Sequence, residues 1–360
     1  MVRIGILKSS KIRPLGITPD TLKKWSADVA IFLIEKDAGE LANFSDDQFI
    51  ALGAKISSRE ELLKNIDILV LSDELSDQDL SLLPLNTLIV GLLNPYNNKP
   101  FIEKLLAQRR SVFALEKLPR TSLAQSMDVL SAMASLAGYK AVILAANHFG
   151  GYFPMLTTTA GTVPPAKVLI LGAGVAGLQA IATAKRLGAV VEAFDVRKAV
   201  KEEVESLGAK FIMVEGLQSD VQSGGYAVVQ KEDEIALQRA LIHEKAMKAD
   251  IVITTASIPG KSAPKLIEKR TVEAMKSGSV IIDLAAASGG NCELTQNGVT
   301  IDFAGITIIG DSELAYSLSR EASKLFSVTI TNFIKHLTKN GLDQINFEDE
   351  IVQGTLLKNE

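Results

Sequence analysis

The sequence has little cysteine, little histidine and no long uncharged apolar run, and each shortage excludes a class of protein. A single cysteine, Cys292, excludes a disulfide framework and fits a reducing compartment. The three histidines, His148, His243 and His336, lack the spacing of metal ligands, so no metal site is predicted. No charge-free apolar stretch reaches roughly 18 residues, so no direct membrane insertion is expected.

The chain also lacks an excess of either charge. Its 360 residues are 47% hydrophobic and 22% charged, and this composition is typical of globular proteins. The formal net charge of −4 argues against nucleic acid as a partner. A chain of this length is long enough for two domains.

Short apolar runs alternate with helical patterns and predict βαβ units, with mostly parallel sheets. The first series of predicted strands occupies residues 2–7, 29–34, 68–72, 87–93 and 111–116. The second series occupies residues 167–172, 190–196, 210–214, 250–256, 279–285 and 306–310. The sequence therefore predicts two α/β domains.

Two long helical patterns suggest how these domains are connected. A helix predicted at 123–149 carries the chain out of the first domain, and a helical pattern at 319–339 is expected to return to it. The second domain, residues 126–311, is thus predicted to be inserted into the first, residues 1–125 plus 312–360. The acidic stretch 346–360 is expected to be a surface tail.

The segment GAGVAG, residues 172–177, has the glycine spacing of a dinucleotide-binding loop between a strand and a helix. Gly172 would allow a tight turn, Gly174 would let the backbone approach a pyrophosphate, and Gly177 would let helix and strand pack closely. Such a pattern alone is weak, and a βα turn without a ligand is the alternative. The residues predicted to bind the cofactor in this region are Gly172, Gly174, Val175, Ala176, Gly177, Asp195, Val196, Arg197, Thr255 and Ala256.

Asp195 ends the next predicted strand, where a carboxylate accepts hydrogen bonds from the adenosine ribose. A carboxylate there also repels a 2′-phosphate, so NAD(H) is predicted over NADP(H). Arg197 and Lys198 follow closely and could in principle attract that phosphate. The predicted fold is Rossmann-like in both domains.

A polar cluster, RTSLAQSMD at residues 120–128, precedes the long helix. It places a cation, Arg120, an amide, Gln125, and a carboxylate, Asp128, within a few residues of one another. One interpretation is helix capping with a surface ion pair. The other is a site that holds a planar polar ligand.

The segment AGTVPPAKVLILGAGVAGLQAIATAKRLGAVVEAFDVR, with PRTSLAQSMDVLS before it and VITTASIPGK and GSVIIDLAAASGGN after it, resembles a known family. The family is the NAD(H)-binding component of proton-translocating nicotinamide nucleotide transhydrogenase. The resemblance is dense from about residue 118 to residue 291 and sparse outside these limits. Alanine dehydrogenase, which shares the fold, is the nearest rival.

The resemblance implies that Arg120, Gln125 and Asp128 form a loop beside the nicotinamide. Arg120 would donate to the carboxamide, Gln125 would bond the carboxamide or the ribose, and Asp128 would pair with Arg120. Ser131 would add a hydroxyl contact. Tyr226 would belong to a mobile loop that closes over the nucleotide.

The resemblance further implies direct hydride transfer from NADH to NADP⁺ held on a partner. The implied partners are a membrane-spanning proton-channel subunit, an NADP(H)-binding subunit and a second copy of this chain. The implied location is cytoplasmic, at the inner face of the membrane through those partner subunits.

Departures from alanine dehydrogenases weaken the rival interpretation. Their Arg, Lys and His, which serve the substrate carboxylate and acid–base work, would align near Pro14, at Leu71 and at Leu92. Arg13 is adjacent to the first position and could substitute there. Leucine cannot transfer protons, which reductive amination requires, whereas hydride transfer between two nicotinamides requires only alignment of the rings. Two alternatives remain open: an amino- or oxo-acid dehydrogenase with its acid–base pair elsewhere, and a non-catalytic NAD-binding protein.

Overall fold

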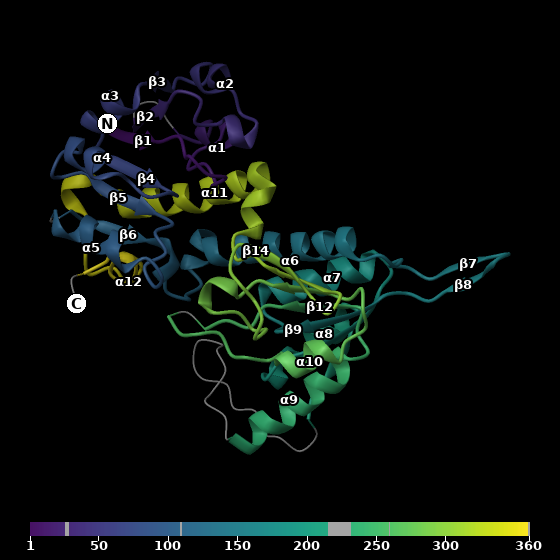
Figure 1. Cartoon of the computed structure of the whole chain (residues 1–360). Helices are drawn as coiled ribbons and strands as arrows, with labels where there is room; N and C mark the ends of the chain where they lie inside the picture. The colour runs from purple at the N-terminus through teal and green to yellow at the C-terminus, as the bar shows by residue number, and fades with distance from the viewer. Residues whose placement is uncertain (26–28, 109, 215–231, 259, 359–360) are drawn as a thin grey trace. The chain divides into compact units, whose positions relative to one another are not determined.

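The computed structural model describes residues 1–360 except 26–28, 109, 215–231, 259 and 359–360. The chain divides into two compact units. Unit 1 comprises Met1–Met133 and Tyr316–Glu360, and unit 2 comprises Ala134–Ala315. In Figure 1 the purple N-terminal and yellow C-terminal segments accordingly belong to the same unit. The divisions fall at 133/134 and 315/316, whereas the predicted boundaries are 125/126 and 311/312.

Unit 1 contains a six-stranded sheet of order β3-β2-β1-β4-β5-β6, in which all neighbouring strands are parallel. Its strands are β1 (Val2–Ile6), β2 (Ala30–Glu35), β3 (Lys55–Ser57), β4 (Ile68–Leu71), β5 (Leu88–Gly91) and β6 (Val112–Ala114). Strand β4 is buried at every position, as expected for a parallel sheet covered on both faces. The five predicted strands are present, whereas the short edge strand β3 was not predicted.

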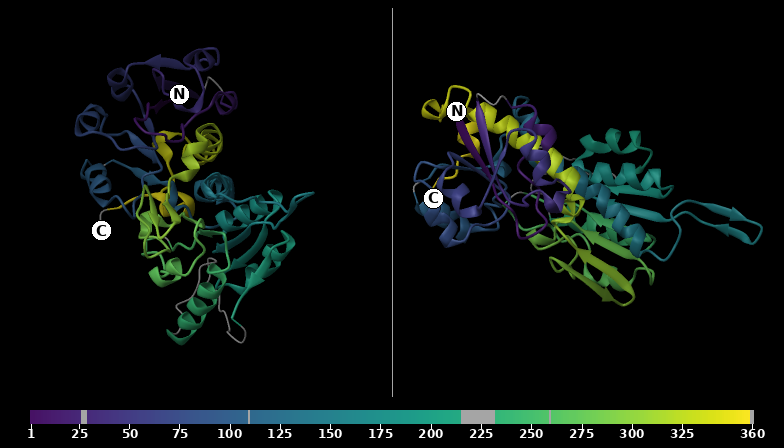
Figure 2. Two further views of the ribbon diagram at one scale, coloured as in Figure 1. Left: turned by 45° about the vertical axis from the view of Figure 1, so that its right-hand side comes forward. Right: turned by 90° about the horizontal axis from the view of Figure 1, so that it is seen from above.

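The helices of unit 1 include α11, which the chain reaches only after completing unit 2. They are α1 (Pro19–Leu22), α2 (Asp46–Ile50), α3 (Arg59–Lys64), α4 (Asp77–Leu82), α5 (Lys99–Ala107), α11 (Ser319–Leu337) and α12 (Glu350–Thr355). Figure 2 shows yellow-green α11 among the purple and blue elements of unit 1. The rings of Phe113 in β6 and Phe333 in α11 are both fully buried, with centroids 5.9 Å apart. This confirms that the C-terminal helix packs on the first domain.

The prediction of a surface tail at residues 346–360 is wrong. Helix α12 lies in this stretch, and Asp349 caps it by accepting from the backbone N–H groups of Ile351 and Val352. Both of these side chains are buried. The Leu357 N–H also donates to the Val112 carbonyl at 2.8 Å. Ile351 and Val352 lie within an acidic segment, and only the folded unit shows that they are buried. The sequence pattern alone therefore did not indicate this helix.

Unit 2 contains a seven-stranded sheet of order β11-β10-β9-β12-β13-β15-β14. Its strands are β9 (Lys167–Leu171), β10 (Val190–Phe194), β11 (Lys210–Ile212), β12 (Ile251–Thr254), β13 (Val280–Asp283), β14 (Val299–Phe303) and β15 (Ile306–Gly310). Only the edge pair β14–β15 is antiparallel; the other neighbours are parallel. The fold is therefore α/β with mostly parallel sheets, as predicted. Strand β14 was missed because it is a largely exposed edge strand without an apolar run.

The helices of unit 2 are α7 (Val175–Arg186), α8 (Lys201–Ser206), α9 (Glu232–Ala246) and α10 (Lys269–Glu273). A two-stranded hairpin, β7 (Leu156–Thr158) with β8 (Gly161–Val163), pairs only with itself. Figures 1 and 2 show it projecting away from the remainder of unit 2. Every residue of the two strands is exposed.

The long connecting helix, α6 (Val129–His148), begins later than the predicted position 123. Residues Ala124–Met127 instead form a 3₁₀ helix, and Asp128 caps α6 through the Ser131 N–H. By length and composition α6 alone among the described helices could cross a membrane, which is weak support for a span. Of its most apolar stretch, 33% is buried in the structure, and Ala141, Val142 and Ala145 belong to the buried core of unit 2.

Candidate nucleotide-binding site

The glycine-rich loop of unit 2 has the backbone geometry that its sequence predicts. Gly172 adopts φ +101°, a conformation in which a side chain would be strained. A Cβ atom at Gly177 would lie 1.9 Å from the Gly172 carbonyl oxygen, so only glycine permits this close packing. A Cβ at Gly174, in contrast, would meet nothing within 4 Å. The loop therefore leaves open space at the position where a pyrophosphate is expected.

Helix α7 begins directly after Gly174, which is its N-cap residue. The Leu178 N–H makes the first hydrogen bond to the Gly174 carbonyl, at 2.8 Å. The N–H groups of Val175, Ala176 and Gly177 precede it and have no acceptor within the helix, because an α-helix leaves its first N–H groups unpaired. These donors and the helix dipole favour an anion at this end of α7.

Asp195, at the end of β10, is 8% exposed and fixes the loop from the neighbouring strand. Its Oδ2 atom accepts from the Ala173 N–H at 2.8 Å and from Arg197 Nη2 at 3.0 Å. Its Oδ1 atom accepts from the Arg197 N–H at 2.8 Å and from Arg197 Nε at 3.0 Å. These hydrogen bonds to the carboxylate raise the pKa of the Arg197 guanidinium above its usual value.

The four donors occupy the acceptor positions of the Asp195 carboxylate. A ribose hydroxyl must therefore replace side-chain donors of Arg197 before it can bind the carboxylate. Val196, between the two charged residues, packs partly buried against the core of unit 2. The sequence predicted Asp195 and Arg197 as site residues, but not their bidentate pairing.

Thr255 and Ala256 follow β12 and adjoin the same loop. The Thr255 hydroxyl donates to the Gly172 carbonyl at 3.0 Å, and its N–H donates to the Leu171 carbonyl at 2.8 Å. The Ala256 N–H donates to Asn291 Oδ1 at 3.0 Å, and its carbonyl accepts from Asn291 Nδ2 at 2.8 Å. Asn291 is fully buried. The role of Asn291 in holding the backbone of Ala256 was not predicted, although Asn291 ends the segment GSVIIDLAAASGGN.

The polar cluster of residues 120–128 lies in unit 1. Arg120 and Gln125 are exposed, whereas Asp128 and Ser131 are partly buried. Asp128 Oδ2 accepts from Ser131 Oγ at 2.6 Å, and Oδ1 accepts from the Ser131 N–H at 2.9 Å. The capping interpretation thus describes Asp128, while its pairing with Arg120 remains a prediction. Tyr226, predicted in a mobile loop, lies outside the described residues.

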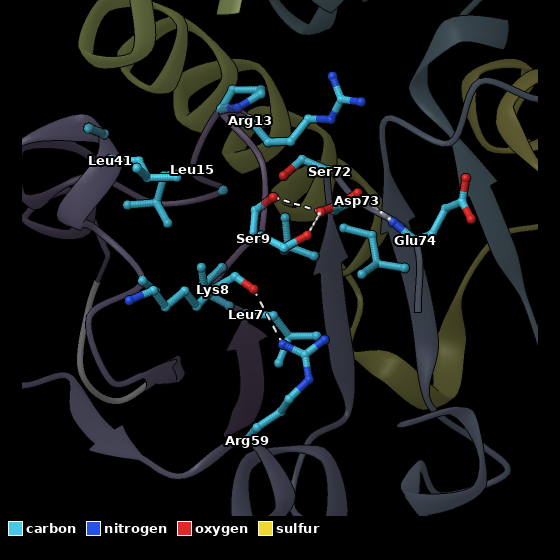
Figure 3. A pocket seen from close by; sticks show the side chains of 18 of the residues that line it. Leu7, Lys8, Ser9, Arg13, Leu15, Leu41, Arg59, Ser72, Asp73 and Glu74 are labelled. Carbon is cyan, nitrogen blue, oxygen red and sulfur yellow. Dashed lines mark hydrogen bonds between the residues drawn. The ribbon is translucent and has the colours of Figure 1, made fainter. Parts of the chain in front are cut away.

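Unit 1 contains a cavity of about 310 Å³ at the carboxyl ends of β1 and β4, where the strand order reverses. Ligands of open α/β sheets bind at such positions. Figure 3 shows Ser9 directed at Asp73, and the hydroxyl donates to the carboxylate at 2.7 Å. Arg59 donates to Glu35 and Asp79, and Lys8 donates to Glu40. Because these charged groups already pair within the protein, the cavity does not define a ligand.

Leu71 and Leu92 are the residues predicted to align with ionisable groups of alanine dehydrogenases. Leu71, the last residue of β4, is buried in the core of unit 1. The Leu92 N–H donates to the Leu71 carbonyl at 3.0 Å, which joins the ends of the two strands. Neither side chain can donate or accept a proton.

Glu116, after β6, carries a buried carboxyl group, and burial raises its pKa to about 7. Its Oε1 atom accepts from the Asn94 N–H at 2.6 Å. Among the described residues, its buried Oε2 atom has no hydrogen-bond partner. The carboxyl group therefore takes up a proton near neutral pH.

The fold and the loop together define a two-domain protein with a Rossmann-like nucleotide-binding unit, and comparison with known proteins identifies the family. The model of the alanine dehydrogenase/PNT N-terminal domain matches residues 11–137, and that of the C-terminal domain matches residues 141–360. The chain belongs to the alanine dehydrogenase/PNT family, on the branch of the NAD(P) transhydrogenase alpha subunits.

Relatives from this branch align over nearly the whole chain. The first part of NAD(P) transhydrogenase subunit alpha from Rickettsia prowazekii is 43% identical over 90% of this chain and 85% of its own length. The protein of the same name from Rhodospirillum rubrum is 42% identical over 95% and 91%. Alanine dehydrogenase 1 of Staphylococcus aureus is more distant, at 26% identity over 93% and 87%.

Solved structures agree with this placement. A transhydrogenase from Sinorhizobium meliloti superposes with a TM-score of 0.89 at 38% identity, covering 99% of this chain and 98% of that one. An L-alanine dehydrogenase superposes with a TM-score of 0.80 at 24% identity, covering 98% and 94%, and this likeness shows the shared fold.

Proposed function

We propose that this chain is the NAD(H)-binding subunit of a proton-translocating transhydrogenase and delivers hydride from NADH to NADP⁺ held on a partner subunit. The observation that carries the proposal is the open space at Gly174, beside the first N–H groups of α7 and close to Asp195. The names of the relatives that are 42–43% identical support the same activity.

In this proposal unit 2 holds the adenosine and pyrophosphate parts of the nucleotide. The N–H groups of Val175, Ala176 and Gly177 donate to the pyrophosphate, and the α7 dipole favours its charge. Arg197 swings aside, and Asp195 accepts from the adenosine ribose. Thr255 keeps the turn at Gly172 closed through its 3.0 Å hydrogen bond.

The polar cluster of unit 1 orients the nicotinamide. Exposed Gln125 and Arg120 supply the amide and guanidinium groups that hold the carboxamide in one direction. Asp128 and Ser131 fix the first turn of α6 and so limit the movement of the cluster. Bound NADH supplies the hydride, so the protein has to align the ring and exclude water but need not transfer a proton.

The absence of ionisable groups at Leu71 and Leu92 supports transhydrogenation over the alanine dehydrogenase reaction. Imine formation and hydrolysis need a proton donor and acceptor beside the substrate, and loss of both costs orders of magnitude in rate. Direct transfer between two nicotinamides has no such requirement.

The family name implies a complex of several subunits, and we propose three partners. A membrane-spanning subunit would conduct protons, and another subunit would hold NADP(H), so the chain would lie at the cytoplasmic face of the membrane. A second copy of this chain would cover the β7–β8 hairpin, since a two-stranded hairpin is marginally stable alone in water. Exposed Met155, Leu156 and Val163 along this hairpin fit an apolar contact.

Single-turnover hydride transfer tests the proposal. Wild-type chain with the NADP(H)-binding subunit should oxidise NADH, and Gln125→Asn should lower the rate by about 100-fold, because a displacement of about 1 Å has that cost. NADH affinity should change little. Gln78→Asn, the same change at an exposed position of α4, is the control.

Two results would contradict the proposal. One is robust turnover of NADH with pyruvate and ammonia by the chain alone, which would favour the alanine dehydrogenase alternative. The other is absence of NADH oxidation in the reconstituted mixture although NADH binds, which would favour a non-catalytic NAD-binding protein.

A further inference from the structure

Helix α6 approaches the end of the glycine-rich loop, at the first turn of α7, more closely than a side chain would permit. A Cβ atom at Gly138 would lie 2.0 Å from the Ala176 carbonyl oxygen, 2.8 Å from its carbonyl carbon and 3.0 Å from its Cα atom. All three are backbone atoms, which cannot move aside as the end of a flexible side chain can. Within the sequence of α6, only a glycine at this position allows the observed contact.

The neighbouring contacts show why the two helices lie so close together. Ala141 and Ala145 of α6 share a buried core with Ala180 and Ala184 of α7, and these small side chains allow a short distance between the helices. The backbone at Gly138 thus forms a fixed surface behind the first turn of α7. The Ser135 hydroxyl adds only a long hydrogen bond to Gln179 Oε1, at 3.4 Å.

The atom that Gly138 contacts belongs to a residue of the predicted anion site. Ala176 lies between Gly174 and Gly177, and its N–H is one of the donors that α7 leaves unpaired. A peptide group moves as a rigid plane, so a shift of the Ala176 carbonyl also shifts the adjoining backbone donors. Ordinary van der Waals contact needs at least 3.4 Å, so a methyl group at position 138 would displace this backbone by about 1 Å or more.

We infer that Gly138 is a positioning residue for nucleotide binding: it sets the place of the α7 N–H donors that receive the pyrophosphate. This inference rests on the proposed function in taking NADH as the ligand. It adds a residue outside the glycine-rich loop and outside the polar cluster to those that determine affinity.

The test is Gly138→Ala, with affinities for NADH, ADP and adenosine measured by displacement titration. NADH and ADP should bind about 10- to 100-fold more weakly, the cost of one or two charge-assisted hydrogen bonds. Adenosine has no phosphate and should bind as it does to the wild type. A general disturbance of the fold would weaken all three ligands together, so the ratio of ADP to adenosine affinity is the decisive measurement.

Two control variants separate the backbone contact from other effects. Gly150→Ala changes a glycine just beyond α6 whose Cβ would meet nothing within 4 Å, and it should leave all affinities unchanged. Ser135→Ala removes the long hydrogen bond to Gln179 and should also have no effect. Equal ADP affinity of Gly138→Ala and wild type would overturn the inference, whereas failure of wild type to bind NADH would overturn the proposed function instead.

Hydrogen exchange of the wild-type protein gives a second test, which applies even if Gly138→Ala does not fold. ADP should slow exchange of the α6 amides around Gly138, because occupied donors hold the first turn of α7 against this helix. Adenosine should not slow it. Equal exchange with and without ADP would contradict the inference.

Discussion

Exchange of Asp195 for asparagine should lower the preference for NADH over NADPH. Two unit charges 4 Å apart interact by about 4 kcal/mol at an effective dielectric constant of 20. The Arg197 guanidinium pairs with the carboxylate at 3.0 Å and stays on the same loop when it swings aside for the ribose, so it cancels most of the repulsion that a 2′-phosphate would meet. A remainder of roughly 1–2 kcal/mol predicts that Asp195→Asn reduces the preference by about tenfold.

Exchange of Arg197 for alanine should act in the opposite direction. The Asp195 carboxylate would lose its neighbouring positive charge, so a 2′-phosphate would be repelled more strongly and the preference for NADH would rise. NADH affinity should be kept or improved, because the positions on Asp195 that Arg197 Nε and Nη2 occupy become available to ribose hydroxyls.

Isothermal titration of each variant with both nucleotides measures these preferences. Glu192→Gln is the control, since it removes one carboxylate from the same strand, where Glu192 pairs with Lys245 at 3.1 Å. The reasoning is refuted if wild type binds NADH and NADPH equally. It is also refuted if the Asp195 and Arg197 variants shift the preference in the same direction.

Two further predictions concern pH and assembly. Because burial raises the pKa of Glu116 to about 7, the folded protein binds its proton more tightly than the unfolded chain, and stability is lost as pH rises from about 4.5 to 7. Glu116→Gln should therefore gain up to roughly 3 kcal/mol over wild type between pH 5 and pH 8 in urea unfolding, and a pH-independent difference would contradict this. The double variant Leu156→Ser with Val163→Ser should shift the dimer towards monomer in analytical ultracentrifugation. The control Val299→Ser, on exposed β14, should not. An unchanged dimer in the double variant would contradict the proposed hairpin contact.

The sequence predicts the parallel sheets well because their strands are buried on both faces and form continuous apolar runs. Strand β4, buried throughout, is an example. The turn at Gly172 and the contact between Gly172 and Gly177 also follow from glycine spacing, since each needs a residue without a side chain. Each of these features depends on residues that are close together in the sequence, so a sequence pattern is enough to predict it.

Features that depend on distant partners could not be predicted in this way. The start of α6 was placed too early because Leu123 and Ala124 continue the apolar pattern, whereas the Asp128 cap determines where the helix begins. Asn291 holds Ala256 from a separate segment, so no motif indicates its role. Ile351 and Val352 are buried only because unit 1 supplies a surface for them.

The insertion of unit 2 between the two segments of unit 1 has a consequence for synthesis of the protein. Phe326, Ile330 and Phe333 of α11 fill the core of unit 1 with almost no exposure, yet they leave the ribosome after the whole of unit 2. The first 133 residues must therefore wait with an incomplete apolar core, while unit 2 can fold as soon as its own segment has emerged. We therefore expect nascent unit 1 to expose apolar surface for longer than unit 2 during translation.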